Sequence, residues 1–147
     1  MRNSIGLAIL ASLTLAGCGR PSAIHADHAY VRLPAVAGRP AVAYFTIHGG
    51  PADTVLLSVT SPVVIRTELH ESMTGAGNMA HMAPIKSVAV PAGTSIAFAP
   101  GGRHAMLFNV NPSVLPGSNV QLLLTFTDNT RLSVTAPVVA AGDPAPY

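Results

Sequence analysis

Short apolar runs separated by Pro and Gly turns fill the chain from residue 28 onward, and they limit its fold more than any other feature. No long stretch shows the periodicity of an amphipathic helix. Many short strands with turn signals between them are typical of an antiparallel sandwich, not of repeating βαβ units. The pattern predicts nine strands, at residues 28–33, 41–48, 54–60, 63–69, 85–90, 95–99, 105–110, 120–127 and 132–138.

The turns indicate how these strands connect. Asp128-Asn129 is a hairpin signal between the last two strands. Pro100-Gly101-Gly102 is another turn, and it leads the chain directly into His104. We therefore expect a single-domain, all-β sandwich over residues 28–140, followed by a loose tail at residues 141–147.

The N-terminus predicts export. A short positive start at residues 1–4 precedes an apolar run at residues 5–15, which is too short for a membrane span of about 20 residues. Leu15-Ala16-Gly17-Cys18 then resembles a lipobox. We expect a signal peptide at residues 1–17, lipidation of Cys18, and a tether at residues 18–27 that anchors the protein on the periplasmic or cell-surface side of a membrane. A simple secreted protein is the alternative, but it would keep an unpaired thiol.

Composition narrows the possible functions. The chain from Cys18 onward has 130 residues, enough for one domain with its own core. Without Arg2, seven Lys and Arg face six Asp and Glu, so the net charge is near +1. Such a balance argues against nucleic acid and against electrostatic binding to lipid headgroups. With a single cysteine, no internal disulfide can form.

Four residues suggest a metal site. His70 and Met82 are followed, after 21 intervening residues, by the close pair His104 and Met106. Thioether and imidazole donors together suit Cu(I), a soft cation. On a strand, alternate side chains share a face, so His104 and Met106 can reach one ion while Ala105 points away.

Each of these residues alone has a plainer interpretation. A single histidine at a strand end is commonly solvated, and methionine commonly fills gaps in a core. Met82, however, follows His81 and precedes Ala83 and Pro84, small and polar surroundings that are unusual for a core methionine. The absence of a thiolate ligand argues against a blue-copper electron-transfer centre. No nucleophile motif or carboxylate pair suited to acid and base catalysis is present, so we expect no enzyme activity.

The spacing of His70, Met82 and the His104-x-Met106 pair resembles the signature of the periplasmic copper chaperones called PCu(A)C. The segments Glu68 to Glu71, Pro100 to Leu107 and Val120 to Asp128 add to the resemblance, which covers residues 28–138. It implies a cupredoxin-like Greek-key β-sandwich that binds one Cu(I) through His70, Met82, His104 and Met106. It also implies a role in cytochrome c oxidase assembly, with copper carried toward the CuA centre, often alongside Sco-type copper proteins.

Two positions depart from the family pattern. Glu71 stands where methionine is common, and we expect its hard anionic side chain to stay solvated. His48 stands where asparagine is common, and we interpret it as a surface histidine.

Further donors lie near both ends of the pattern. Met73, Met79 and His81 are a possible secondary landing place for copper, although the plainer interpretation is packing and exposure. His25, Asp27 and His28 form a loose polar cluster near the tether that binds either Cu(II) or nothing.

Three hypotheses remain at this stage. The first is a membrane-tethered Cu(I) chaperone that delivers copper to an oxidase. The second is a copper scavenging or resistance lipoprotein that uses the same site without delivery. The third is an immunoglobulin-like interaction module whose His and Met cluster binds no metal.

Overall fold

A computed structural model describes residues 22–75, 77 and 79–147, and this part of the chain is all β, as expected. The predicted signal peptide and Cys18 lie outside the described residues. Ten strands follow one another: β1 (His25–Arg32), β2 (Ala41–His48), β3 (Thr54–Thr60), β4 (Val64–Thr74), β5 (Ala80–Ile85), β6 (Val88–Val90), β7 (Ser95–Phe98), β8 (Arg103–Val110), β9 (Asn119–Phe126) and β10 (Arg131–Val139).

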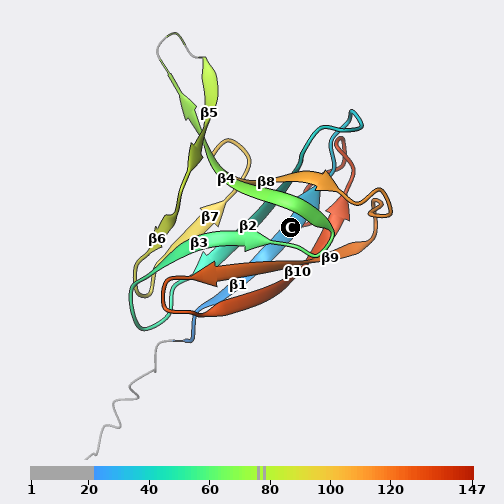
Figure 1. The fold of residues 1–147 in the computed structure, drawn as a ribbon. Coiled ribbons are helices and arrows are strands. Elements are labelled where there is room, and N and C mark those ends of the chain that lie inside the picture. The colour runs from blue at the N-terminus through green and yellow to red at the C-terminus, as the bar shows by residue number, and fades with distance from the viewer. Residues whose placement is uncertain (1–21, 76, 78) are drawn as a thin grey trace, which may run out of the picture.

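The strands form two layers (Figure 1). The first layer has the order β5-β4-β8-β7-β2-β1, and the second has the order β10-β9-β3-β6. The layers are joined where β1 pairs in parallel with β10, with Val31 opposite Val138. The predicted hairpin is confirmed, because β9 and β10 pair along their length and Asn129 adopts a positive φ of 64° between them.

Alternation along the strands builds the core between the layers. In β2, Ala41, Ala43, Phe45 and Ile47 are buried, and the residues between them are half-buried on the outer face. The Phe45 ring stacks on that of Phe98 with centroids 4.3 Å apart. Because the apolar side chains point inward, the outer face of the first layer is free to carry polar and metal-binding groups.

The β4–β5 hairpin extends beyond the body of the sandwich (Figure 1). The sequence pattern leaves Met82 outside the expected strands, which is wrong, and predicts one strand over residues 85–90, which the structure interrupts at residues 86–87. Met82 lies on β5, which ends at Ile85, and β6 belongs to the other layer. The strand escaped prediction because β5 is an edge strand, largely exposed, that lacks apolar alternation and contains Pro84.

The ends of the domain are more ordered than expected. The strand β1 begins at His25, so the last three residues of the expected tether belong to the sheet. The Arg32 guanidinium donates hydrogen bonds to the carbonyl oxygens of Ala140 and Ala141, both at 3.2 Å, which ties the start of the expected loose tail to β1. Within the described residues, no helix has the length and hydrophobicity that a membrane crossing requires.

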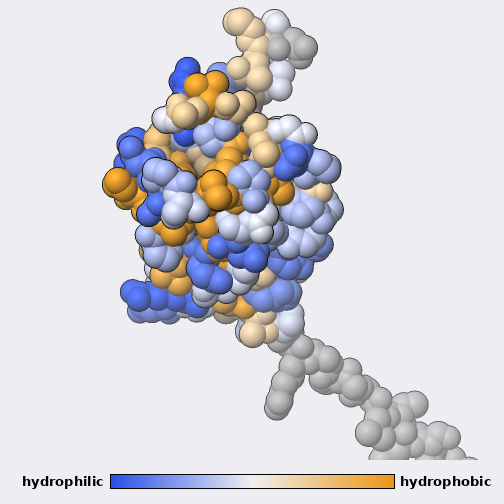
Figure 2. Space-filling model, turned by 90° about the vertical axis from the view of Figure 1, so that its right-hand side faces the viewer, coloured by the Kyte–Doolittle hydropathy of each residue, from blue (hydrophilic) through white to orange (hydrophobic). Residues whose placement is uncertain are grey.

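One end of the sandwich carries an apolar groove with a volume of about 780 Å³. Its lining includes Leu33, Val64 and Val110, and Figure 2 shows hydrophobic side chains gathered on this side of the molecule. Val64 lies six residues before His70 on β4, about 20 Å away along an extended strand. The groove is therefore separate from the candidate metal centre.

Candidate metal centre

The register of β4 and β8 brings two of the predicted ligands directly together. His70 pairs with His104, and their rings stack with centroids 5.9 Å apart. Glu68 pairs with Met106 two positions along, so all four side chains share the same face of the sheet. Met106 also pairs with Val42 of β2, which places this face on the outside of the first layer.

The His104 side chain is buried and its hydrogen bonding defines its tautomer. The residue is 4% exposed. Its Nδ1 lies 3.0 Å from the carbonyl oxygen of Gly102, and because a carbonyl only accepts, Nδ1 must donate. In the neutral ring, Nε2 then carries the lone pair. That Nε2 is buried and has no hydrogen-bond partner within residues 22–75, 77 and 79–147.

The His70 side chain shows the same arrangement with its nitrogens exchanged. Its Nε2 donates to the Glu68 carboxylate at 3.1 Å, so in the neutral ring the lone pair is on Nδ1. That Nδ1 is likewise buried, and no described residue forms a hydrogen bond with it. The hydrogen bond from His70, aided by the nearby Arg66 guanidinium, holds the pKa of Glu68 below its ordinary value. Glu68 therefore stays anionic at neutral pH and fixes the ring of His70.

These two nitrogens fit a metal ion. Among the described residues, three buried side-chain polar atoms have no hydrogen-bond partner, and Nδ1 of His70 and Nε2 of His104 are two of them. Leaving such a group unsatisfied costs about 1–3 kcal/mol, so each position calls for a ligand or another compensation. An imidazole whose other nitrogen donates to a carboxylate or a carbonyl is the usual form of a metal-binding histidine.

The two methionines are placed differently. Met106 is half-buried beside Glu68, diagonal to His70 across the strand pair. Met82 pairs with Ser72, on the same face as His70, but it is 58% exposed on the projecting hairpin. Met82 and Met106 are separated by four residues along the strands and by two strand spacings across the sheet. In a flat sheet they would therefore lie about 16 Å apart. The structure thus brings His70, His104 and Met106 together and leaves Met82 farther out.

Three of the remaining predicted donors lie on the opposite face of the sheet: Glu71, Met73 and His81. Glu71 pairs with Arg103, one position from the histidine pair, and forms an ion pair with it at 3.2 Å. Met73 pairs with His81 on that same opposite face of the hairpin. Met79 is 72% exposed just before β5. Met73 and His81 are thus adjacent to each other but separated from the face that carries Met82.

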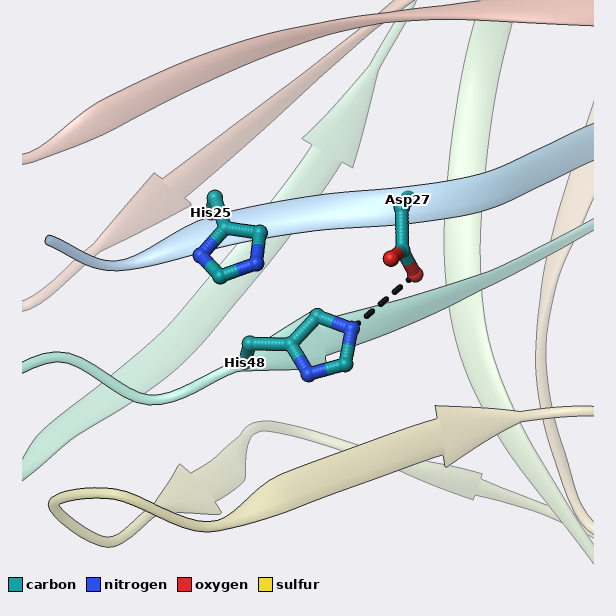
Figure 3. A group of neighbouring side chains, drawn as sticks. All are labelled: His25, Asp27 and His48. Atoms are coloured by element: carbon teal, nitrogen blue, oxygen red, sulfur yellow. Dashed lines mark hydrogen bonds and ion pairs between the residues drawn. The ribbon is translucent and has the colours of Figure 1, made fainter. Parts of the chain in front are cut away.

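A second group of donors lies at the start of β1. His25, Asp27 and His48 each offer one ligand atom, and these atoms lie within 4.8 Å of one another (Figure 3). The sequence analysis grouped His25 and Asp27 with His28 and left His48 as a separate surface residue. It missed His48 because the strand was expected to begin at residue 28, which left residue 25 without a pairing partner.

Glu68 is the second residue that the sequence analysis missed. Its position two residues before His70 would have placed both side chains on one face of a strand. This signal was present but does not by itself reveal a hydrogen bond.

Comparisons with known proteins identify the family of this chain. The chain matches the family described as "Putative lipoprotein LpqE-like" over residues 24–138. It is 28% identical over 89 residues to the putative lipoprotein Lxx21020 of Leifsonia xyli subsp. xyli (strain CTCB07). That match includes 60% of this chain and 54% of the relative, so the chain spans about half the length of the curated relative it matches.

Solved structures share the fold. The copper-bound PCuAC domain from PmoF2 superposes with a TM-score of 0.66 at 21% identity, over 82% of this chain and 95% of that chain. The solution structure of CuI-DR1885 from Deinococcus radiodurans superposes with a TM-score of 0.62 at 24% identity, over 84% of this chain and 83% of that chain. The expected resemblance to PCuAC domains is thereby confirmed in the fold. The match over residues 24–138, together with this shared sandwich, shows that the chain belongs to the LpqE-like family.

Proposed function

We propose that this protein is an extracytoplasmic Cu(I)-binding chaperone whose cargo is held by His70, His104, Met106 and Met82. The observation that carries the proposal is a pair of buried imidazole nitrogens on facing residues of β4 and β8, for which the described part of the chain supplies no hydrogen-bond partner. The names of two structural neighbours, one a copper-bound PCuAC domain and one CuI-DR1885, support copper as the metal.

The donor set favours Cu(I) over harder ions. Two neutral imidazoles and neutral thioethers match a soft monovalent cation, whereas zinc sites use thiolate, imidazole or carboxylate ligands. Met106 supplies a sulfur next to the histidine pair. Met82 would join when the β4–β5 hairpin bends toward this face, which is feasible because the arm is a two-stranded ribbon without a covering layer.

An exposed ligand suits a carrier. Because Met82 lies on the projecting β4–β5 hairpin, it can leave the ion without disturbing the core. A partner's thiolate could then take the vacated position while His70 and His104 still hold the metal. Transfer proceeds in this way through a shared-ligand intermediate.

The destination and the anchor are further parts of the proposal. We propose that the acceptor is the CuA subunit of cytochrome c oxidase or a Sco-type copper protein. The family and the curated relative are both named as putative lipoproteins, which supports a lipid anchor at Cys18 and a location outside the cytoplasm. Neither the site nor the fold suggests catalysis, so we propose a binding role without enzyme activity.

A transfer assay tests the proposal. The full chain, loaded with one Cu(I) per molecule, is mixed in excess with an apo CuA domain. Added ferricyanide then oxidises the two transferred Cu(I) ions by one electron to the mixed-valence centre, whose absorption reports copper arrival. We expect transfer from the wild-type protein and none from the double variant His104→Ala/Met106→Ala, which should fail to load. A wild-type protein that binds Cu(I) but never yields it would contradict delivery and favour copper scavenging. A protein that binds no Cu(I) would contradict the whole proposal.

A further inference from the structure

We propose that His25, Asp27 and His48 form a second metal site, specific for a borderline divalent cation and best suited to Cu(II). This site is distinct from the histidine and methionine centre and does not depend on the function proposed above.

The pairing of β1 with β2 creates the group. His25 pairs with His48 and Asp27 pairs with Thr46, so the three side chains project from the same outer face (Figure 3). The two rings are stacked, with centroids 4.6 Å apart and planes inclined by 16°. Cu(II) prefers a tetragonal arrangement of its donors. Donor atoms about 2.0 Å from the ion then lie about 2.8 Å apart when adjacent and about 4 Å apart when opposite. The 4.8 Å limit therefore requires changes in donor separation of about 2 Å or less, which side-chain rotation can supply.

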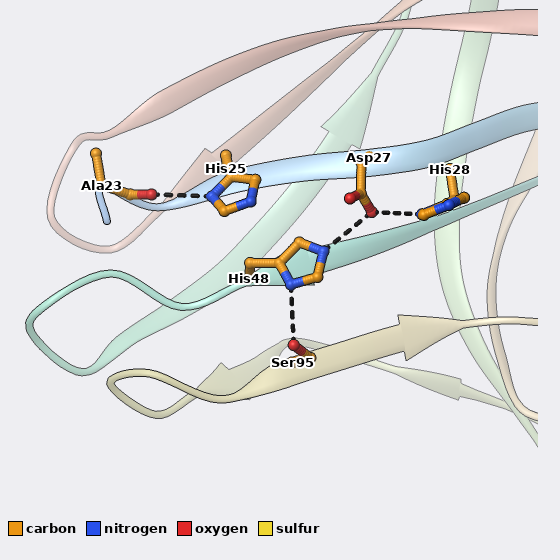
Figure 4. Close-up of polar contacts among 6 residues, drawn as sticks. All are labelled: Ala23, His25, Asp27, His28, His48 and Ser95. Carbon is orange, nitrogen blue, oxygen red and sulfur yellow. Dashed lines mark hydrogen bonds and ion pairs between the residues drawn. The ribbon is translucent and has the colours of Figure 1, made fainter. Parts of the chain in front are cut away.

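Hydrogen bonds already orient the donors (Figure 4). The Nδ1 of His25 donates to the carbonyl oxygen of Ala23 at 3.0 Å, so in the neutral ring Nε2 carries the lone pair. In His48, Nδ1 lies 2.9 Å from the Ser95 hydroxyl, and Nε2 lies 3.0 Å from the Asp27 carboxylate. For an ion to bind Nε2 between His48 and Asp27, the proton of the neutral ring must stand on Nδ1, which then donates to the Ser95 hydroxyl and keeps the ring in place.

The backbone around the group is unusually constrained. A bulge interrupts β1 between Asp27 and Tyr30, and His28 within it has a φ of +49°, which is uncommon for a residue other than glycine. This conformation lets His28 Nδ1 donate to Asp27 at 2.8 Å. The hydrogen bonds from His28 and His48 meet at the same carboxylate oxygen of Asp27 and hold it close to the histidines.

Tight packing also holds the strand end that carries His48. A Cβ at Gly49 would lie 2.4 Å from the Pro91 carbonyl oxygen, and a Cβ at Gly50 would lie 2.9 Å from the Ile24 nitrogen. The Gly49 N–H donates to the Thr94 carbonyl oxygen at 2.7 Å. This end of β2 therefore has little freedom to move His48 away from its partners.

Donor chemistry separates the two sites. Two imidazoles and a carboxylate contain no sulfur, so the group favours borderline divalent ions over Cu(I), and Cu(II) ranks highest among them.

The Asp27 and His48 side chains are 43% and 30% exposed, which leaves an entry path for the ion. Both sites lie on the outer face of the first layer. Ala43 of β2 pairs with Ala105 of β8, so the next residue of β2, Tyr44, lies beside His104. Tyr44 and His48 are four residues apart on β2, which separates the two sites by about 13 Å along this strand.

The test uses the full chain carrying His70→Gln and His104→Gln, so that the first centre cannot bind Cu(II). Cu(II) is titrated and followed by electron paramagnetic resonance, in which nitrogen ligands give resolved hyperfine structure. We expect one Cu(II) with nitrogen coupling, and a loss of affinity of at least tenfold when His48→Gln or Asp27→Asn is added. His81→Gln, which removes an exposed histidine elsewhere, is the matched control and should change nothing.

Circular dichroism and thermal unfolding show whether each variant is folded. If His48→Gln does not fold, Asp27→Asn, which preserves the shape of the side chain, is used in its place. Equal affinities in all variants, or no Cu(II) bound in the parent, would overturn the proposal. Cu(I) affinity is measured separately on the His48→Gln single variant. Its loss there would mean that the two sites are not distinct, and the proposal would fail.

Discussion

Replacing Met82 by alanine separates its role as a ligand from a structural role. Met82 is 58% exposed on an edge strand, so truncation removes little buried surface, and we expect the free energy of unfolding to change by no more than about 0.5 kcal/mol. A buried methionine would instead cost about 2–5 kcal/mol. If Met82 binds the ion, Cu(I) affinity should fall about 10- to 100-fold, which corresponds to about 1.4–2.7 kcal/mol.

The matched control is Met73→Ala. Met73 belongs to the same hairpin and is 45% exposed, but it pairs with His81 on the opposite face. Competition with a chromogenic Cu(I) chelator measures affinity for both variants, and chemical denaturation of the metal-free protein measures stability. Equal weakening by the two substitutions would refute the argument from register. Unchanged affinity in Met82→Ala would reduce the ligand set to His70, His104 and Met106.

Three further predictions concern the supports of the two sites and the pH dependence of stability. Glu68→Ala removes the acceptor that orients His70, so Cu(I) affinity, measured by chelator competition, should fall about 10- to 100-fold. Glu68→Gln keeps an acceptor oxygen and should weaken Cu(I) binding less. An unchanged affinity in Glu68→Ala would show that this hydrogen bond does not contribute to Cu(I) binding. Gly49→Ala should cost about 1–3 kcal/mol in denaturant unfolding, because its Cβ would meet the Pro91 carbonyl oxygen, whereas Gly142→Ala has open space and should be neutral. A hydrogen bond from the Thr130 N–H lowers the pKa of Asp128 below its ordinary 3.8, so its stabilising contribution is complete above that pH and is lost as the pH falls through the folded pKa. Asp128→Asn should therefore flatten the loss of stability in acid, and an unchanged pH profile would contradict this account.

Much of the fold could be predicted from the sequence because alternation and turn residues are local signals. The β2 pattern and the Asp128-Asn129 turn were both interpreted correctly. The strand β5 could not be predicted, because an exposed edge strand needs no apolar face and tolerates Pro84. The early start of β1 at His25 was missed for a related reason, since residues 25–28 are mostly polar and contain a bulge.

The candidate centre was only partly accessible from the sequence. Spacing alone placed His104 and Met106 on one face, and the structure agrees. That His70 lies directly opposite His104 depends on the register between β4 and β8, which the sequence does not state. The contact between His25 and His48 likewise arises from strand pairing across 23 residues. Such long-range registers are set by the packing of the whole sandwich.

X-ray absorption at the copper edge, recorded on the full chain loaded with one equivalent of Cu(I), tests the central claim most directly. The account predicts a single Cu(I) whose nearest neighbours include both nitrogen and sulfur, and loss of this signature in the His104→Ala/Met106→Ala variant. A spectrum with nitrogen or oxygen neighbours alone, or one that the double variant leaves unchanged, would contradict the claim that these residues hold the ion.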